Sequence, residues 1–312
     1  MEYSFVIPCY KSSATIEKVV TMTMQEMENK EIEFILVNDG SPDEGKTSET
    51  LRTLADKYGN VTAIDLAKNS GQQNAVMCGL NVAVGDYIVC MDDDMQTHPS
   101  QIHKLINKMK EGYDVVYAYY PEKKQRWFRN LGSNFSSWTV RKLIGKPKDL
   151  KTSSFWIAKK FVRDYVIQYK NAYVFIPGLF LRTTSNIGNV GVTHFEREAG
   201  TSGYNLKALL KLWSNILGFS IRPLRMASTL GIFFSFIGFI GALVVMIRKI
   251  LFQIQIEGWS SLIVAICFFS GIILMFMGLI GEYIGRMFLI SGNQPQYVIR
   301  EIRGKRDNDP EK

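Results

Sequence analysis

Cysteine is scarce in this sequence, and the paired cysteines that a disulfide framework or a zinc site needs are missing. Disulfide-rich secreted domains and structural zinc sites both draw on closely spaced cysteines. Without any CxxC pair the chain fits neither class, and it suits a reducing compartment. The four cysteines are scattered, at Cys9, Cys78, Cys90 and Cys267.

Glycine-rich phosphate loops and nucleic-acid motifs are missing as well. No GxGxxG, GxxxxGKS or GxxxxGKT follows the first strand-like segment, Ser4–Pro8, which disfavours a dinucleotide dehydrogenase and a P-loop NTPase. Met1-Glu2 leads straight into this segment, so we expect no secretory signal. The formal net charge of +8 suits an anionic membrane surface, nucleotide or lipid phosphate. No groove-reading or RNA-stacking motif accompanies the charge, so we expect no nucleic-acid partner.

Long uncharged runs dominate only the last third of the chain. Met226–Ile247 and Trp259–Gly281 are runs of 22 and 23 residues without a charge. At about 1.5 Å per residue each reaches roughly 33–35 Å, enough for a hydrocarbon core of about 30 Å. We therefore predict two transmembrane helices, at about 226–247 and 259–283, that form a hairpin.

Basic residues outside the two runs predict the orientation of this hairpin. The positive-inside bias places both termini and the large N-terminal domain in the cytoplasm. Arg248 and Lys249 in the loop weaken the bias without reversing it. The residues that carry the bias are Arg222, Arg225, Arg286, Arg300, Arg303, Lys305 and Arg306.

The chain accordingly divides into four parts. We expect a soluble domain over 1–204, an amphipathic helix over 205–223, the hairpin over 224–287 and a cytoplasmic tail over 288–312. In the second part apolar residues recur at helical spacing, with Trp213 at headgroup depth in an interfacial helix. A helix packed on the soluble domain is the alternative.

Strand-like and helix-like segments alternate through the first 120 residues. This alternation predicts an α/β domain with a mostly parallel sheet covered on both faces. The expected strands are Ser4–Pro8, Glu33–Asn38, Val61–Asp65, Tyr87–Met91 and Asp114–Tyr119, and the expected helices are Ser13–Met27, Thr47–Tyr58, Gln72–Val84 and Pro99–Glu111.

Three adjacent aspartates, Asp92–Asp94, follow the apolar segment Tyr87–Met91. Unpaired carboxylates are costly in a buried strand, so they must emerge at its carboxyl end, where ligands bind in such sheets. Asp92 and Asp94 suit a Mg²⁺ or Mn²⁺ ion shared with a substrate's phosphates. A solvated acidic turn is the alternative. Tyr10 and Asp39 are expected at the same edge, which favours a binding site.

The order and spacing of several motifs resemble the family 2 glycosyltransferases, which have a GT-A nucleotide-sugar-binding domain. More narrowly, the chain is similar to the polyprenyl-phosphate glycosyltransferases, such as dolichyl-phosphate mannose synthase and the bacterial enzymes that load a sugar onto undecaprenyl phosphate. The resemblance extends to about residue 290 and includes the hairpin. It rests on Phe5-Val6-Ile7-Pro8-Cys9-Tyr10, Val37-Asn38-Asp39-Gly40-Ser41-Pro42-Asp43, Asn69-Ser70-Gly71-Gln72-Gln73-Asn74-Ala75, Gly85-Asp86-Tyr87 and Met91-Asp92-Asp93-Asp94-Met95-Gln96.

This resemblance implies a donor site at the sheet edge. Asp39 would accept a ring N–H of the nucleotide base, unless it only caps its own loop as an Asx-turn residue. Pro8 and Tyr10 would line the base and ribose pocket. The metal-binding DxD pair would be Asp92 and Asp94, joined by Gln96, with Asp93 as a less constrained donor-site residue. Arg197 would contact the donor diphosphate, and Ser202 would help to close a loop over it.

The resemblance also implies a site for the acceptor phosphate. Arg129 and Ser133 match the family's phosphate-holding pair, and Arg126 lies in the same basic and aromatic segment, which is otherwise a solvated loop. Arginine suits this role because its hydrogen bonds to phosphate are charge-assisted and often bidentate. Two departures stand out: Gly203 replaces the family's lysine, and Thr152-Ser153-Ser154 replaces a segment that often carries an aspartate. A missing carboxylate base favours a phosphate acceptor over a hydroxyl acceptor, because a phosphate monoester is already largely ionised at pH 7.

We therefore expect a metal-dependent, inverting glycosyltransferase in the inner (cytoplasmic) membrane. It would move a sugar from a nucleotide diphosphate donor, with UDP favoured over GDP, to undecaprenyl phosphate, and so supply a lipid-linked sugar for cell-envelope glycans. The resemblance also implies a homo-oligomer, because relatives assemble as tetramers. The alternatives are a membrane glycosyltransferase acting on a glycan hydroxyl and a catalytically silent nucleotide-sugar-binding protein.

Overall fold

The computed structural model describes residues 1–121, 146–171, 173–193, 195, 222–252, 258–292 and 295–304. The chain divides into two compact units. One comprises Met1–Asn215 together with Gln294–Lys312, and the other comprises Ile216–Asn293. The C-terminal segment therefore belongs to the same unit as the N-terminal domain.

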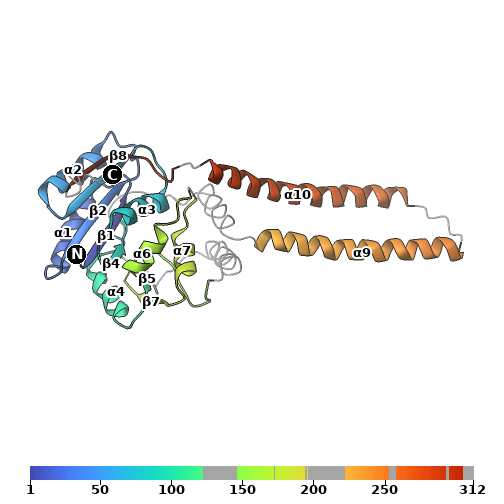
Figure 1. The fold of residues 1–312 in the computed structure, drawn as a ribbon, viewed down its shortest axis with the longest axis horizontal. Coiled ribbons are helices and arrows are strands. Elements are labelled where there is room, and N and C mark those ends of the chain that lie inside the picture. Colours follow the sequence, from blue (N-terminus) through green and yellow to red (C-terminus); the bar gives the residue numbers. More distant parts are fainter. Residues whose placement is uncertain are drawn as a thin grey trace. The chain divides into compact units, whose positions relative to one another are not determined.

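The first unit begins with the alternation that the sequence predicts (Figure 1). Each predicted strand and helix of the first 120 residues is present, with boundaries shifted by a few residues. In order these are β1 (Tyr3–Cys9), α1 (Ile16–Glu26), β2 (Ile32–Asn38), α2 (Lys46–Lys57), β3 (Val61–Leu66), α3 (Gln72–Val82), β4 (Tyr87–Cys90), the 3-10 helix η1 (Pro99–Gln101), α4 (Ile102–Met109) and β5 (Val115–Tyr119).

Five further elements of this unit were not predicted. Four follow in order after β5, and the fifth, β8, comes from the far end of the chain, where the sequence analysis expected only a tail. They are β6 (Trp156–Lys159), α6 (Lys160–Val166), α7 (Ile176–Thr183), β7 (Ile187–Gly191) and β8 (Ile299–Gly304).

All the strands in the described part of the chain belong to one mostly parallel sheet. Their order is β7-β5-β6-β4-β1-β2-β3-β8. Strands β1 to β4 are mutually parallel where they pair. Strand β6 runs antiparallel to both β4 and β5, and β8 runs antiparallel to β3 at the sheet's edge.

Helices cover both faces of the central strands, so β1 and β2 are buried at every position. Phe5 and Ile7 of β1 pack into a core cluster with residues of α1, α2 and α4. The next residue, Val6, meets α3 on the opposite face, where a Cβ at Gly79 would overlap its Cγ1. Burial on both faces is typical of parallel strands and explains their continuous apolar sequence.

The strand order places a binding edge between β1 and β4. From β1 the chain proceeds to β2 and β3 on one side, and it then crosses through α3 to β4 on the other. The strand order therefore reverses between β1 and β4, and the loops that follow these two strands meet at the carboxyl ends, where Tyr10 and Thr15 bond to Asp93. Such a topological switch point is where open α/β sheets bind ligands.

The described residues of the second unit form two long helices, α9 (Arg222–Phe252) and α10 (Trp259–Ser291). Phe234 of α9 and Phe269 of α10 make an edge-on ring contact, with centroids 6.5 Å apart. Within the described residues, no helix has the length and apolar character needed to cross a membrane. The transmembrane hairpin stays a prediction, and the predicted amphipathic helix lies outside the described residues up to position 221.

Candidate active site at the carboxyl edge of the sheet

The three aspartates form a tight turn directly after β4. The backbone N–H of Asp92 donates to Thr97 Oγ1 at 3.0 Å, and the N–H of Gln96 donates to Asp94 Oδ1 at 3.1 Å. Met95 between them has a φ of 64°, a left-handed conformation that a non-glycine residue adopts only at some cost. The carboxylates thus emerge at the strand's end, as the sequence predicts.

Asp92 is held from two sides by hydrogen bonds to its carboxylate. Gln72 Nε2, at the first position of α3, donates to Oδ1 at 3.0 Å, and the hydroxyl of Ser154, just before β6, donates to Oδ2. Burial raises the pKa of Asp92 from 3.8 to about 6; Asp94 and Asp93 add to the rise, and the two hydrogen bonds oppose it. Because burial and the neighbouring aspartates disfavour the charged form of Asp92, a nearby cation would stabilise that form.

Asp93 joins the loop after β4 to the loop after β1. Its Oδ2 accepts the backbone N–H of Tyr10 at 3.0 Å, and its carbonyl oxygen accepts the hydroxyl of Thr15 at 2.6 Å. Burial raises the pKa of Asp93, and the Tyr10 N–H opposes that rise. The middle aspartate thus bonds to groups of the protein itself, while Tyr10 is about half exposed (48%).

Pro8 lies in the central strand β1, two residues before Tyr10. A proline is unusual there because it has no N–H to donate to a neighbouring strand. Strand β1 pairs with β4 only as far as Val6, so the missing N–H of Pro8 does not interrupt that ladder. On the other side, the Cys9 carbonyl accepts the N–H of Asp39 at 3.0 Å. Pro8 therefore fits at the point where β1 separates from β4 and the binding edge begins.

Asp39, directly after β2, organises the loop that precedes α3. Its Oδ1 accepts the N–H of Ser70 at 2.6 Å, and its Oδ2 accepts the N–H of Gly71 at 2.9 Å. The residue is buried. Gly40 has a φ of 59°, and an added Cβ would lie 2.5 Å from the backbone nitrogen of Asn69. The loops after β2 and β3 therefore pack directly on each other around Asp39.

Two side chains at this edge were not assigned a role from the sequence. Tyr120 follows β5, and burial raises its pKa, helped by the negative charges of Asp92 and Asp94. Gln72 belongs to one of the family-like motifs but has no predicted function. Ser154 had been noted only as a departure from the family pattern, and its contact with Asp92 joins positions 62 residues apart, which no local pattern reveals.

The chain that leads toward position 197 is anchored beside the acidic loop. The N–H of Thr193 donates to Gln101 Oε1 at 3.3 Å, and Phe195 stacks on His98 with ring centroids 4.6 Å apart. Five predicted site residues lie outside the described residues and their roles stay predictions: Arg126, Arg129, Ser133, Arg197 and Ser202.

A ready-made metal cage is not present among the described residues. No three or more His, Cys, Asp or Glu side chains are grouped there to hold a metal ion. The predicted set of Asp92, Asp94 and Gln96 contains only two carboxylates and an amide. It can bind a cation strongly only if another molecule supplies further oxygens.

We predict that Asp92→Asn stabilises the metal-free protein at neutral pH. Because the pKa of Asp92 is raised to about 6, the folded state binds a proton more tightly than the unfolded chain. Ionisation of Asp92 then lowers stability as the pH rises from about 4 to 6. Removing the charge should raise the free energy of unfolding at pH 7.5 by at most about 3 kcal/mol.

Urea unfolding in EDTA at pH 4 and 7.5 measures this difference between the wild type and the variant. An asparagine can accept from Gln72 through its oxygen and donate to the Ser154 hydroxyl, so the local contacts survive. The gain should vanish at pH 4. An equal change at both pH values, or a loss of stability at pH 7.5, would contradict the prediction.

Comparisons with known proteins match most of this chain. The sequence model of Glycosyl transferase family 2 matches residues 4–186. The uncharacterized glycosyltransferase YkcC of Bacillus subtilis (strain 168) is 34% identical over 310 residues, 97% of this chain and 95% of that protein. An undecaprenyl-phosphate 4-deoxy-4-formamido-L-arabinose transferase of Proteus mirabilis (strain HI4320) is 30% identical over 307 residues, 96% of this chain and 94% of that protein.

Among solved structures, a glucosyl-3-phosphoglycerate synthase from Mycobacterium tuberculosis shares the fold. Its complex with Mn²⁺, uridine diphosphate and phosphoglyceric acid superposes with a TM-score of 0.52 at 18% identity, over 70% of this chain and 78% of that one. At this identity the likeness supports the fold alone. It confirms the predicted GT-A architecture with a mostly parallel sheet.

Proposed function

This chain belongs to glycosyl transferase family 2, and we propose that it transfers a sugar from a nucleotide diphosphate to polyprenyl phosphate. The observation that carries the proposal is the meeting of Tyr10, Asp39 and the three aspartates at one sheet edge. Relatives over nearly the whole chain are named as undecaprenyl-phosphate sugar transferases, which supports undecaprenyl phosphate as the acceptor.

The donor nucleotide, for which we favour UDP, occupies the edge beside β1 and β2. The Asp39 carboxylate accepts a ring N–H of the base, since ionised carboxylate oxygens can each accept more than one hydrogen bond. Pro8 and the half-exposed Tyr10 lie at the carboxyl end of the neighbouring strand and border the base and ribose. The diphosphate then points toward the loop after β4.

The acidic loop suits a divalent cation that is shared with this diphosphate. Mg²⁺ in phosphate-handling sites is held by one or two carboxylates together with the substrate's phosphates. Asp92 and Asp94 supply the protein's share, with Gln96 beside them, which agrees with the absence of a three-residue cage among the described residues. When bound, Mg²⁺ or Mn²⁺ neutralises charge on the departing diphosphate.

Transfer proceeds by a single displacement that inverts the anomeric carbon. An oxygen of the acceptor phosphate forms a bond to this carbon, while the bond from the carbon to the donor diphosphate breaks with its electron pair. We assign Arg197 to the leaving diphosphate, and Arg126, Arg129 and Ser133 to the acceptor phosphate. The acceptor is largely a dianion at pH 7, with a second pKa of about 6, so the reaction needs no carboxylate base at the position of Ser154.

We further propose, from the sequence, that the segments 226–247 and 259–281 anchor the enzyme in the cytoplasmic membrane. Two uncharged runs of 22 and 23 residues and the basic residues that flank them support this. The isoprenoid tail of the acceptor stays in the bilayer beside the hairpin and the amphipathic segment. Both termini lie in the cytoplasm, and a homo-oligomer is the expected assembly.

Reconstitution of the full chain tests this function. Purified protein in nanodiscs should form a glycolipid from undecaprenyl phosphate and one member of a panel of UDP- and GDP-sugars, only with Mg²⁺ or Mn²⁺ present. Mass spectrometry identifies the product, and undecaprenol, which lacks the phosphate, is the matched control. Transfer to a free glycan without any glycolipid would instead support the hydroxyl-acceptor alternative.

A further inference from the structure

The strand that follows the second long helix returns to the sheet beside the proposed donor site. Strand β8 pairs antiparallel with β3, from Thr62↔Gly304 to Leu66↔Ile299. The Ala67 N–H also donates to the Val298 carbonyl at 2.8 Å. The pairing thus continues to the end of β3, where the chain turns toward the residues that bind Asp39.

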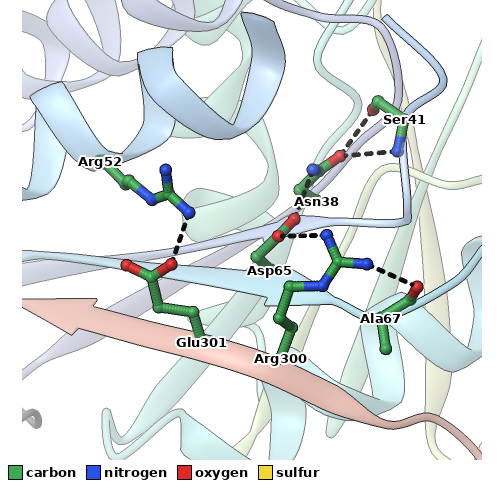
Figure 2. A network of polar contacts seen from close by, with 7 residues as sticks. All are labelled: Asn38, Ser41, Arg52, Asp65, Ala67, Arg300 and Glu301. Carbon is green, nitrogen blue, oxygen red and sulfur yellow. Dashed lines mark hydrogen bonds and ion pairs between the residues drawn. The ribbon is translucent and has the colours of Figure 1, made fainter. Parts of the chain in front are cut away.

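Arg300 of β8 bridges two points at the end of β3 (Figure 2). Its Nη2 donates to the Ala67 carbonyl at 3.0 Å, and its Nη1 lies 3.7 Å from Asp65 Oδ2. Ala67 begins the loop whose Ser70 and Gly71 N–H groups bind the Asp39 carboxylate. Arg300 therefore contacts the start of the same loop whose backbone N–H groups hold the Asp39 carboxylate.

A second connection runs from β8 through side chains to the loop after β2, which begins at Asp39. Asn38 Nδ2 donates to Asp65 Oδ1 at 2.6 Å, and Asn38 Oδ1 accepts the Ser41 hydroxyl at 2.6 Å and the Ser41 N–H at 3.2 Å. Ser41 Oγ in turn accepts the N–H of Lys11 at 3.0 Å. Asp65 thus fixes the loop after β2, and that loop contacts the residue after Tyr10.

We propose that β8 is a working part of the donor site, and that Asn38, Asp65 and Arg300 are positioning residues for the Asp39 carboxylate. Arg300 is the point where both connections meet. This inference rests on the proposed donor role of Asp39 but concerns a different part of the chain. The segment after α10 is then required for donor binding, because β8 is part of the sheet of the first unit.

Burial decides which links matter most. Asn38 is 3% exposed and Asp65 is 9% exposed, so their hydrogen bond is shielded from water and its loss leaves a buried group unpaired. The Arg300 side chain is 62% exposed, and exposed ion pairs contribute little. We therefore expect Asn38→Ala to act strongly and Arg300→Ala moderately.

The test compares Arg300→Ala and Asn38→Ala with Arg303→Ala in the full chain. Arg303 is the matched control, because it lies on the same strand and pairs at 2.7 Å with Asp56 of α2, a residue that takes no part in the contacts of Asn38, Asp65 and Arg300 described above. For UDP with Mn²⁺, measured by calorimetry, the Kd should rise about threefold to fivefold in Arg300→Ala and roughly tenfold in Asn38→Ala. The control should stay within twofold, and kcat at saturating donor should change little in all three.

Amide hydrogen exchange of the nucleotide-free protein gives a second, independent readout. The Ser70 and Gly71 amides should exchange faster in Arg300→Ala than in Arg303→Ala. Faster exchange in a protein that binds neither UDP nor GDP would uphold the coupling and contradict the proposed function. Unchanged exchange and Kd in both test variants, or equal effects in the control, would overturn the role of β8.

Discussion

Asp92→Asn and Asp94→Asn are each expected to reduce sugar transfer by at least about a thousandfold, because the diphosphate would lose counter-charge worth several kcal/mol. Asp93→Asn should keep the rate within about tenfold of the wild type, since an asparagine oxygen can still accept the Tyr10 N–H. The three residues are adjacent, but Asp93 bonds to the loop after β1, whereas Asp92 and Asp94 are the proposed cation ligands.

Initial rates across a Mn²⁺ titration, with undecaprenyl phosphate and the active donor, measure this difference. Mn²⁺-dependent UDP binding should disappear in Asp92→Asn and Asp94→Asn, although Asp92→Asn is expected to be more stable than the wild type without metal. A variant that loses Mn²⁺-dependent UDP binding but unfolds at higher urea than the wild type has lost function and kept its fold. If Asp93→Asn were as inactive as its neighbours, or if Asp92→Asn kept its Mn²⁺ dependence, the division of roles would be wrong.

The sequence predicted the parts of the site that depend on strand ends. Asp92 directly follows a continuous apolar segment, Asp39 follows another one after Asn38, and a parallel sheet brings such ends to one edge. Location at that edge therefore followed from the hydrophobic pattern and from the cost of burying charge. The same pattern predicted the elements of the first 120 residues, where each strand and helix has a strong local signal.

The contacts between distant segments could not be predicted in this way. Ser154 reaches Asp92 because β6 pairs antiparallel with β4, and pairing between segments so far apart leaves no local pattern. Strand β8 was missed because its Ile-Arg-Glu-Ile-Arg-Gly sequence reads as a charged tail. Arg300 and Arg303 were taken as membrane-flanking charges, and the structure also gives them ion-pair partners in Asp65 and Asp56.

Asp39→Asn is expected to weaken donor binding by about a hundredfold, which combines two losses of roughly 1–3 kcal/mol each. Both carboxylate oxygens accept backbone N–H groups, from Ser70 and Gly71. An asparagine must turn its NH₂ toward one of these donors, so that one contact becomes repulsive and the loop after β3 shifts. The second loss is the hydrogen bond that we propose from the base.

Binding of two probes separates these contributions. If Asp39 contacts the base, Asp39→Asn should lower the affinity for UDP far more than that for inorganic pyrophosphate, both measured with Mn²⁺. If Asp39 only holds the loop, the two affinities should fall together, along with the thermal stability. Ser41→Ala is a useful comparison, because it removes a hydroxyl from the same loop and leaves the carboxylate in place. An unchanged UDP affinity in Asp39→Asn would exclude Asp39 from the donor site, because neither the base contact nor the loop it holds would then contribute to binding.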